Sequence, residues 1–391
     1  EEVNMKKSFH LVLAFLALIS TAFACTLPFG AQQPFGETPV PETTSLLPHT
    51  FYYLGRDSTG LLQVFRIEKD GKTMKQITFE PTAVGRYDVS HIDGNVAYVA
   101  NNQLLLINAD GSGRRVLVDG GPTNPDSPRE NNISHPVFSP DGQTIAYVHN
   151  GLNLYNVPTG VSRLVLGKPV IDPVNGGMMQ DAWYRPEKYS PDGAKLLITI
   201  SVPYTDATHD AIYDPATNAV VRFSSVDGSF FCCGEEQWTP DSLSFYAASS
   251  TVGMFGSGLW KVDATTGNVS TLIPGDAGGE NFNLADEPYL APDGQLYFFF
   301  ANASSPNGMI ERAPLQLVRS APDGVTGRTV LRPDTFELMN ESLWAPDAGF
   351  VVVAFAPTQD VYGGGRAEIV YLDGSPNMIL TEFAQYMKWG P

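Results

Sequence analysis

Ionisable side chains recur just ahead of a repeated motif, in which a large apolar residue is followed by x-Pro-Asp. They are Asp88, His135, Arg185, Glu187, Glu235, Glu236, Asp286, Glu287 and Glu341. If the fold gathers them, they form an acidic rim that can bind a divalent cation through oxygen ligands or attract a cationic peptide. The alternative is a solvated channel entrance with no specific ligand.

A second group of candidate residues is apolar. It comprises Met178, Met179, Trp183, Tyr184, Phe230 and Phe231, all in segments that precede copies of the motif. Gathered on a surface, these side chains would form an exposed patch for a peptide or a sugar. The alternative is that they fold back over the ends of the strands.

Residues suited to catalysis are few. His135, Arg185 and Glu187, with His209, are the candidates for acid and base groups. The sequence contains no G-x-S-x-G elbow, phosphate-binding loop or dinucleotide fingerprint. Only six histidines occur, which disfavours a metal site built from several of them. We therefore predict no catalytic residues and no cofactor, with a divalent cation at the rim as a weaker possibility.

The motif belongs to a longer internal repeat. Its copies are "FSPDGQTIAYV" (138–148), "YSPDGAKLLITI" (189–200), "WTPDSLSFYAAS" (238–249), "LAPDGQLYFFF" (290–300), "WAPDAGFVVVAF" (344–355) and a degenerate "HIDGNVAYVA" (91–100). Each unit of about 50 residues reads as four short β-branched and aromatic strands separated by turns, which is typical of a propeller blade.

Seven such units can be counted, but the first (49–80) lacks its opening strand. The C-terminal "QYMKWGP" (385–391) aligns with "SHPVFSP" and "NESLWAP", so it supplies that strand from the other end of the chain. Trp238, Trp344 and Trp389 share one repeat position and are predicted core residues. The predicted fold is all-β: a seven-bladed propeller of four-stranded antiparallel blades, closed by pairing of the C-terminal strand with the N-terminal blade.

The repeat resembles that of TolB-type, WD-repeat-like β-propeller proteins. Ser139-Pro140-Asp141-Gly142 and Ser190-Pro191-Asp192-Gly193 match the family pattern closely, whereas Thr239-Pro240-Asp241-Ser242 and Ala345-Pro346-Asp347-Ala348 depart at the glycine. The resemblance covers residues 49–391. It implies a propeller, in a family that includes scaffolds, binding modules and accessory domains of enzymes, so it does not select a function.

Antiparallel connectivity places the short Pro-Asp-Gly turns on one face of such a fold. The long connections, including residues 118–133, 170–183 and 224–235, then lie on the opposite face together with both candidate groups. Long loops on a rigid scaffold commonly carry binding residues, so we expect function on this face.

The N-terminus carries an export signal. Met5, Lys6 and Lys7 precede an apolar stretch and the small-residue segment "TAFAC" (21–25), which predicts a signal peptide over residues 1–24. Cys25 would then open the mature chain and is the predicted site of lipidation in a bacterial lipoprotein; the alternative is simple secretion. Residues 25–48 read as a Pro, Gly and Thr-rich spacer, ahead of a propeller over residues 49–391.

The formal net charge of −18 disfavours nucleic acid and anionic membrane surfaces as partners. The adjacent Cys232 and Cys233 read as buried thiols, with a vicinal disulfide as the alternative. We expect an envelope or extracellular protein or peptide as the partner, with a membrane contact only through the lipid.

Three functions fit these observations. The preferred one is a tethered binding scaffold, the second is a metal-assisted lyase or hydrolase acting on a saccharide or peptide at the channel mouth, and the third is a structural surface protein.

Overall fold

The computed structural model describes residues 45–123, 131–167, 170–171, 178–179, 183–201, 208–224, 236–253 and 256–391. Residues Thr44–Pro391 form one compact unit. The predicted signal peptide, Cys25, Phe230, Phe231, Cys232, Cys233 and Glu235 lie outside the described residues. Leu47, at the end of the predicted spacer, is buried in a core cluster.

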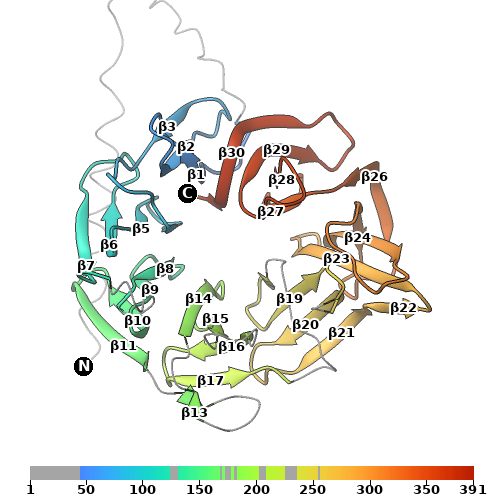
Figure 1. Cartoon of the computed structure of the whole chain (residues 1–391), viewed down its shortest axis with the longest axis horizontal. Helices are drawn as coiled ribbons and strands as arrows, with labels where there is room; N and C mark the ends of the chain where they lie inside the picture. The colour runs from blue at the N-terminus through green and yellow to red at the C-terminus, as the bar shows by residue number, and fades with distance from the viewer. Residues whose placement is uncertain are drawn as a thin grey trace, which may run out of the picture. The chain divides into compact units, whose positions relative to one another are not determined.

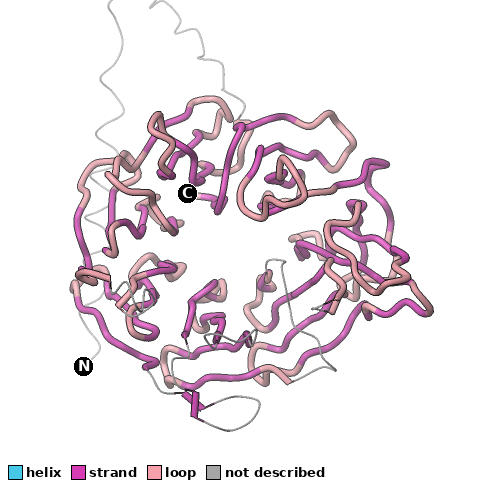
Figure 2. Tube along the Cα trace, in the orientation of Figure 1, coloured by secondary structure: helices cyan, strands magenta, loops and turns pink. Residues whose placement is uncertain are grey.

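The described chain is all-β, and strands without any helix account for its regular structure. In this part of the chain no helix has the length and apolar character needed to cross a membrane. The sheets are arranged around a central axis (Figure 1), and the connections between them are loops and turns (Figure 2).

Four sheets have four antiparallel strands each, in the order of the chain. They are β4 (Arg86–Val89), β5 (Val96–Ala100), β6 (Gln103–Ile107) and β7 (Arg115–Asp119); β8 (Ser134–Phe138), β9 (Thr144–Val148), β10 (Gly151–Asn156) and β11 (Val161–Gly167); β14 (Trp183–Tyr189), β15 (Leu196–Ser201), β16 (Thr208–Asp214) and β17 (Ala219–Arg222); and β18 (Gln237–Trp238), β19 (Ser244–Ser249), β20 (Gly258–Asp263) and β21 (Val269–Pro274). Strands β8 and β14 lie toward the central axis, and β11 and β17 lie at the periphery (Figure 1).

The remaining strands form a five-stranded sheet, a two-stranded sheet and a seven-stranded sheet. The first holds β22 (Asp276–Gly278), β23 (Asn281–Leu290), β24 (Leu296–Ser304), β25 (Leu315–Ser320) and β26 (Thr329–Phe336), and the second holds β12 (Val170–Ile171) and β13 (Met178–Met179). The third has the order β27 (Met339–Trp344), β28 (Phe350–Phe355), β29 (Gly365–Tyr371), β30 (Met378–Trp389), β1 (Phe51–Arg56), β2 (Leu62–Ile67) and β3 (Met74–Gln76).

Strand β30 joins the two ends of this unit. It pairs with β29 through its first half and with β1 through its second half, where Phe51 lies opposite Trp389 and Leu54 opposite Gln385. The predicted pairing of "QYMKWGP" with the N-terminal strands is therefore present. No sheet in the described part of the chain closes on itself.

The Pro-Asp-Gly segments form the predicted turns. In the copy at 139–142, the Ser139 hydroxyl donates to Asp141 Oδ1 at 2.6 Å, and the same oxygen accepts the backbone N–H of Gln143 at 3.0 Å. Gly142 has a φ of 69°, which glycine adopts without strain. Where the repeat lacks this glycine, Ser242 and Ala348 adopt φ values of 61° and 56°.

The three predicted core tryptophans are buried, with exposed fractions of 9% for Trp238, 4% for Trp344 and 8% for Trp389. Their indole N–H groups donate to backbone carbonyls of the preceding central strand, Lys188 for the first, Glu287 for the second and Trp344 for the third. Trp238 and Trp344 thus each fix one sheet against its neighbour, and Trp389 fixes β30 against β27 within the seven-stranded sheet. Apolar clusters between adjacent sheets, and one formed largely by strands of the seven-stranded sheet, make up the core.

Candidate binding site at the centre of the sheets

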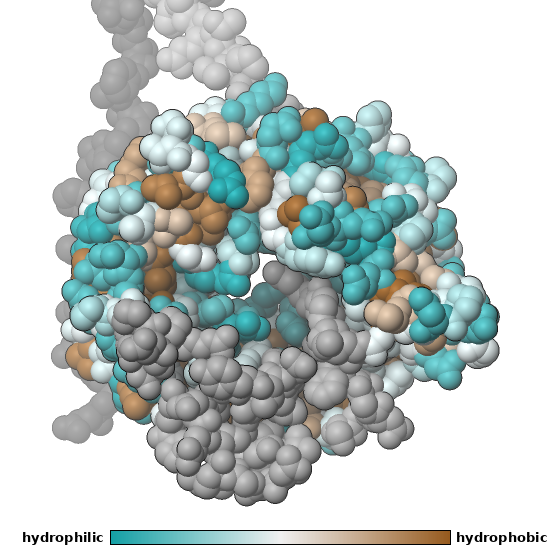
Figure 3. Space-filling view, in the orientation of Figure 1, coloured by the Kyte–Doolittle hydropathy of each residue, from teal (hydrophilic) through white to brown (hydrophobic). Residues whose placement is uncertain are grey.

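A cavity of about 440 Å³ lies where the central strands of several sheets converge. Figure 3 shows the central opening, with hydrophilic residues around the part of it that is described. The charged residues that line the cavity are Arg86, Arg185, Lys188, Lys388, Glu187, Asp210, Glu236, Glu287 and Glu341, together with His135. The cavity therefore differs from the predicted acidic rim, because four basic side chains face five acidic ones.

Irregular pairing in the central strands shapes this wall. The register shifts between Ser134 and Val137 in β8, and between Pro186 and Lys188 in β14. Strand β23 has a similar shift after Asp286, and β1 and β30 pair irregularly near Tyr386. A bulge re-aims the side chains around it, and these four occur at nearly the same place in each central strand.

Three non-glycine residues at these irregularities have a positive φ: His135 at 49°, Glu287 at 50° and Tyr386 at 54°. Such a conformation is uncommon for residues with a Cβ and often occurs where a side chain must be held in a functional position. All three residues line the cavity.

Several of the predicted acidic residues bond to a neighbouring central strand. Glu341 accepts the backbone N–H groups of Tyr386, at 2.7 Å, and Met387. Asp88 accepts the backbone N–H of Phe138 at 2.7 Å, and its other oxygen lies 3.7 Å from the ammonium of Lys388. Asp88 therefore connects two sheets, and Glu341 connects two central strands of the seven-stranded sheet.

The adjacent acidic residues Asp286 and Glu287 are also engaged. Glu287, which is 5% exposed, accepts the Ser342 hydroxyl at 2.9 Å. Asp286 accepts the Ser250 hydroxyl at 2.8 Å, and burial raises its pKa. Asp88 and Asp286 do not line the cavity, so two of the predicted rim residues belong to the structural framework.

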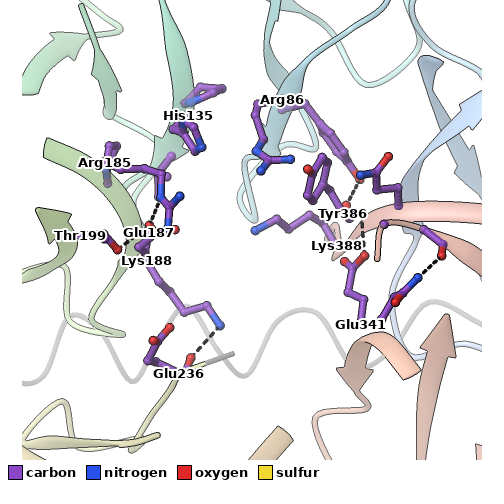
Figure 4. Close-up of a pocket in the computed structure, with 18 of the residues that line it drawn as sticks. Arg86, His135, Arg185, Glu187, Lys188, Thr199, Glu236, Glu341, Tyr386 and Lys388 are labelled. Carbon is purple, nitrogen blue, oxygen red and sulfur yellow. Dashed lines mark hydrogen bonds and ion pairs between the residues drawn. The ribbon is translucent and has the colours of Figure 1, made fainter. Parts of the chain in front are cut away.

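A row of polar residues crosses three strands at one side of the cavity. Arg185 on β14 lies opposite Thr199 on β15, which lies opposite Asp210 on β16. The Thr199 hydroxyl is 2.8 Å from Glu187 Oε1 and 3.0 Å from Asp210 Oδ1, while the Arg185 guanidinium pairs with the same oxygen of Glu187 (Figure 4). One hydroxyl proton thus lies between two carboxyl groups.

The carboxyl groups around this row are shifted toward their protonated forms. Burial is the main cause that raises the pKa of Asp210, and the charge of Glu187 raises it further. Burial also raises the pKa of Glu236, with additional contributions from Asp210 and Glu187. A proton on Asp210 can be donated to Thr199, whose own proton then points to Glu187.

The opposite part of the wall is cationic. The Arg86 guanidinium lies over the Tyr386 ring, 3.6 Å from its centroid. Burial and the nearby charge of Arg185 lower the pKa of Arg86 to about 10, which keeps it protonated at neutral pH. Burial, with the charges of Arg86 and Arg185, lowers the pKa of His135 to about 3, so its imidazole is neutral.

Sequence reasoning missed Arg86, Lys188, Asp210, Tyr386 and Lys388. Asp210 gave no signal because it lies on the third strand of its sheet, away from the repeated motif. Arg86, Lys188, Tyr386 and Lys388 occupy the same motif segment as the predicted acids, so their positions were available from the repeat.

Of the predicted apolar group, only Trp183 and Tyr184 have side chains whose burial is described. Tyr184 is 4% exposed and packs in the core cluster that contains Leu196 and Ile198. Trp183 is half-buried at the start of β14, and Met178 and Met179 form the short strand β13.

The described residues contain no group of three histidine, cysteine or acidic side chains placed to hold a metal ion. Of the proposed acid and base candidates, His135, Arg185 and Glu187 all line the cavity. His209 lies on β16 opposite Ile200.

No protein-family model and no curated protein matches this sequence. Solved structures do resemble it. A TolB protein from Acinetobacter baumannii aligns over 84% of this chain and 77% of its own, at 17% identity and a TM-score of 0.43.

Two other solved proteins align with higher TM-scores. An oligogalacturonate lyase from Vibrio parahaemolyticus aligns over 85% of this chain and 84% of its own, at 11% identity and a TM-score of 0.51. A prolyl endopeptidase aligns over 88% of this chain and 49% of its own, at 13% identity and a TM-score of 0.53, so the chain spans about half of that enzyme. At these identities the likeness extends to the fold alone: the chain shares the architecture of these proteins, a β-propeller as the repeat predicts.

Proposed function

We propose that this chain is an exported, lipid-anchored binding protein, which engages a protein or peptide through the loop-rich face of a seven-bladed propeller. The sequence repeat supports the seven blades, and the pairing of β30 with β1 supports the joining of its first and last blades. The signal-like segment and Cys25 support export and anchoring.

The observation that carries the proposal is the central cavity. It collects charged side chains from strands far apart in the sequence, and the long connections lead into the same ends of those strands. Charged groups held in a concave site of this size are suited to recognise a segment of another molecule. The sequence elsewhere offers no nucleophile elbow or cofactor motif to suggest a different use.

Affinity capture from native envelopes tests the proposal. We would replace residues 172–182 by a Gly-Ser linker and compare the recovered partners with those of the intact protein. A matched control carries Ile92→Ser and Leu243→Ser, two exposed turn residues at the opposite ends of the central strands. We expect the linker variant to lose a partner that the control retains; identical recovery from all three proteins would refute this assignment of the face.

Mass spectrometry of the mature N-terminus tests the anchor. A diacylglyceryl-modified Cys25 is the expected result. A free or absent Cys25 in the mature protein would show secretion without a tether.

An enzyme is the second candidate function, because Asp210 and Glu236 have raised pKa values beside Glu187 in the cavity, and such shifts cluster at catalytic sites. A metal-assisted lyase or hydrolase would bind a divalent metal and turn over oligosaccharide or peptide pools. Elemental analysis without metal, together with no turnover on either pool, would remove this candidate.

A further inference from the structure

We propose that the central cavity binds a carboxylate group of a peptide, held by the guanidinium of Arg86 and the imidazole of His135. The inference deepens the proposed function, on which it rests, by naming the chemical group that the partner presents. It also reverses the expectation of a cation at an acidic rim.

Arg86 is the first part of the argument. Its guanidinium lines the cavity and stacks on Tyr386, but no acceptor of a hydrogen bond from it is found among the described residues. In Figure 4 the group points into the open space between the strands. A charged fork with five N–H donors, held flat by an aromatic ring, is suited to a bidentate bond with a carboxylate.

His135 is the second part. Its Nδ1 atom is buried and has no hydrogen-bond partner among the described residues. His135 has a φ of 49°, lies next to a register shift in β8 and lines the cavity. Because Nδ1 is buried, the ring nitrogen that can meet a ligand is Nε2, and the neutral imidazole can carry its one proton there.

The nearby carboxylates of Glu187 and Glu341 attract Arg86 but accept no hydrogen bond from it among the described residues. Glu341 is engaged by the backbone of β30, and Glu187 by Arg185 and Thr199. Asp210 and Glu236 favour their protonated forms, for the reasons given above. Arg86 therefore keeps its N–H donors available to a ligand, in a protein whose net charge is −18.

The size of the cavity limits what can enter. About 440 Å³ accommodates a side chain or a chain end, but no folded domain. The carboxylate is therefore presented either by an Asp or Glu side chain of a partner loop or by a C-terminus.

Calorimetric titration with short peptides tests this inference. The probes are an alanine tetrapeptide with a free C-terminal carboxylate, the same peptide amidated, an amidated and acetylated Ala-Glu-Ala, and inorganic phosphate. We expect one carboxylate peptide to bind more tightly than its uncharged counterpart, and the affinity to fall as salt is added. The preferred peptide identifies the source of the carboxylate.

Variants locate the site. Arg86→Gln should weaken binding by about tenfold or more, the loss expected when a hydrogen bond to a charged group is removed. Arg86→Lys should retain part of the affinity, and Arg115→Gln, which removes the same charge from an exposed position on β7, should leave it unchanged. In the NMR spectrum of the intact protein, the bound carboxylate should raise the pKa of His135.

Four results would contradict carboxylate binding at Arg86 and His135. Equal affinity for the charged and amidated peptides, no binding by any peptide, or unchanged binding by Arg86→Gln would overturn the inference, and so would binding of phosphate alone. If Arg86→Gln does not fold, the peptide comparison and the His135 titration on the intact protein decide the question. If no carboxylate peptide binds but a partner is still captured, the proposed function stands and this inference fails. If a carboxylate peptide binds but no partner is captured, the result counts against the proposed function alone.

Discussion

Two sides of the central cavity use the same repeat position in different ways. On the side formed by β23, β27 and β30, the position holds Glu287 and Glu341, which accept hydrogen bonds from the next central strand. On the side formed by β4 and β8 it holds Arg86 and His135, whose guanidinium and Nδ1 have no acceptor or donor partner among the described residues. The first side stabilises the molecule, and the second is left for a ligand.

This difference shows that a charged residue at a channel mouth is not by itself a binding residue. A carboxylate that faces the backbone N–H groups of a bulge is satisfied within the fold. A guanidinium at the equivalent place carries only N–H donors, so it cannot bond to backbone N–H groups. Its donors remain available to a ligand. The four predictions below test this contrast, from the largest expected effect to the smallest.

Removal of Glu341 should have the largest effect on stability. Glu341→Ala leaves the backbone N–H groups of Tyr386 and Met387 without their acceptor, and hydrogen bonds to a charged group are the stronger kind. We expect the free energy of unfolding to fall by about 3 kcal/mol, measured by urea denaturation. Glu382→Ala, at an exposed position of the same strand, is the control and should change little. Equal stability of the two variants would contradict the structural role of Glu341.

Asp88→Ala should have an intermediate effect. It removes one backbone hydrogen bond, to Phe138, and a long ion pair with Lys388. The expected loss is about 1.5 kcal/mol by the same measurement. Glu382→Ala, the exposed position used above, again serves as the comparison for general effects of charge. A loss as large as that of Glu341→Ala would show that the number of backbone donors does not set the effect.

Glu236→Gln should raise stability in a pH-dependent way. Because burial and its acidic neighbours raise the pKa of Glu236, the folded protein holds this proton more tightly than the unfolded chain does. The contribution of this proton to the free energy of unfolding is fully present below about pH 4, and it is lost as the pH rises toward the raised pKa. The melting temperature of Glu236→Gln should therefore exceed that of the wild type at mildly alkaline pH and match it in acid. A constant difference across this range would contradict a shifted carboxyl group.

Arg86→Gln should have the smallest effect on folding. The cost of burying the guanidinium offsets its contact with Tyr386, so the free energy of unfolding should change by no more than about 0.5 kcal/mol. Urea denaturation of the ligand-free variant checks this. A loss comparable to that of Glu341→Ala would place Arg86 with the structural residues and remove the contrast between the two sides.

The repeat predicted most of the fold because its turn residues, its core residues and its strand pattern all indicate the same structure. The Pro-Asp-Gly turns, the buried tryptophans and the pairing of the C-terminal segment all follow from aligning copies of one template. Strands and turns depend on residues that are close together in the sequence, so a repeated sequence pattern predicts them well.

The side chains of the site were harder to predict, for a physical reason. Side chains alternate along a regular strand, and a single extra residue moves those beyond it to the other face. Without knowledge of the register shift in each central strand, Asp88 and Arg86 were equal candidates for the cavity, and Asp88 was the one chosen. Asp210 depends on its cross-strand neighbour Thr199, which no spacing along the chain reveals.

The course of β30 has a consequence for how the molecule is made. The backbone of Thr50 lies within hydrogen-bonding distance of Pro391, a residue 341 positions later, and β1 has its second neighbour only when β30 is in place. Until β30 is in place, β1 therefore has one unpaired edge. The β1–β30 pairing brings together the most distant parts of the chain, so we expect it to form late in folding.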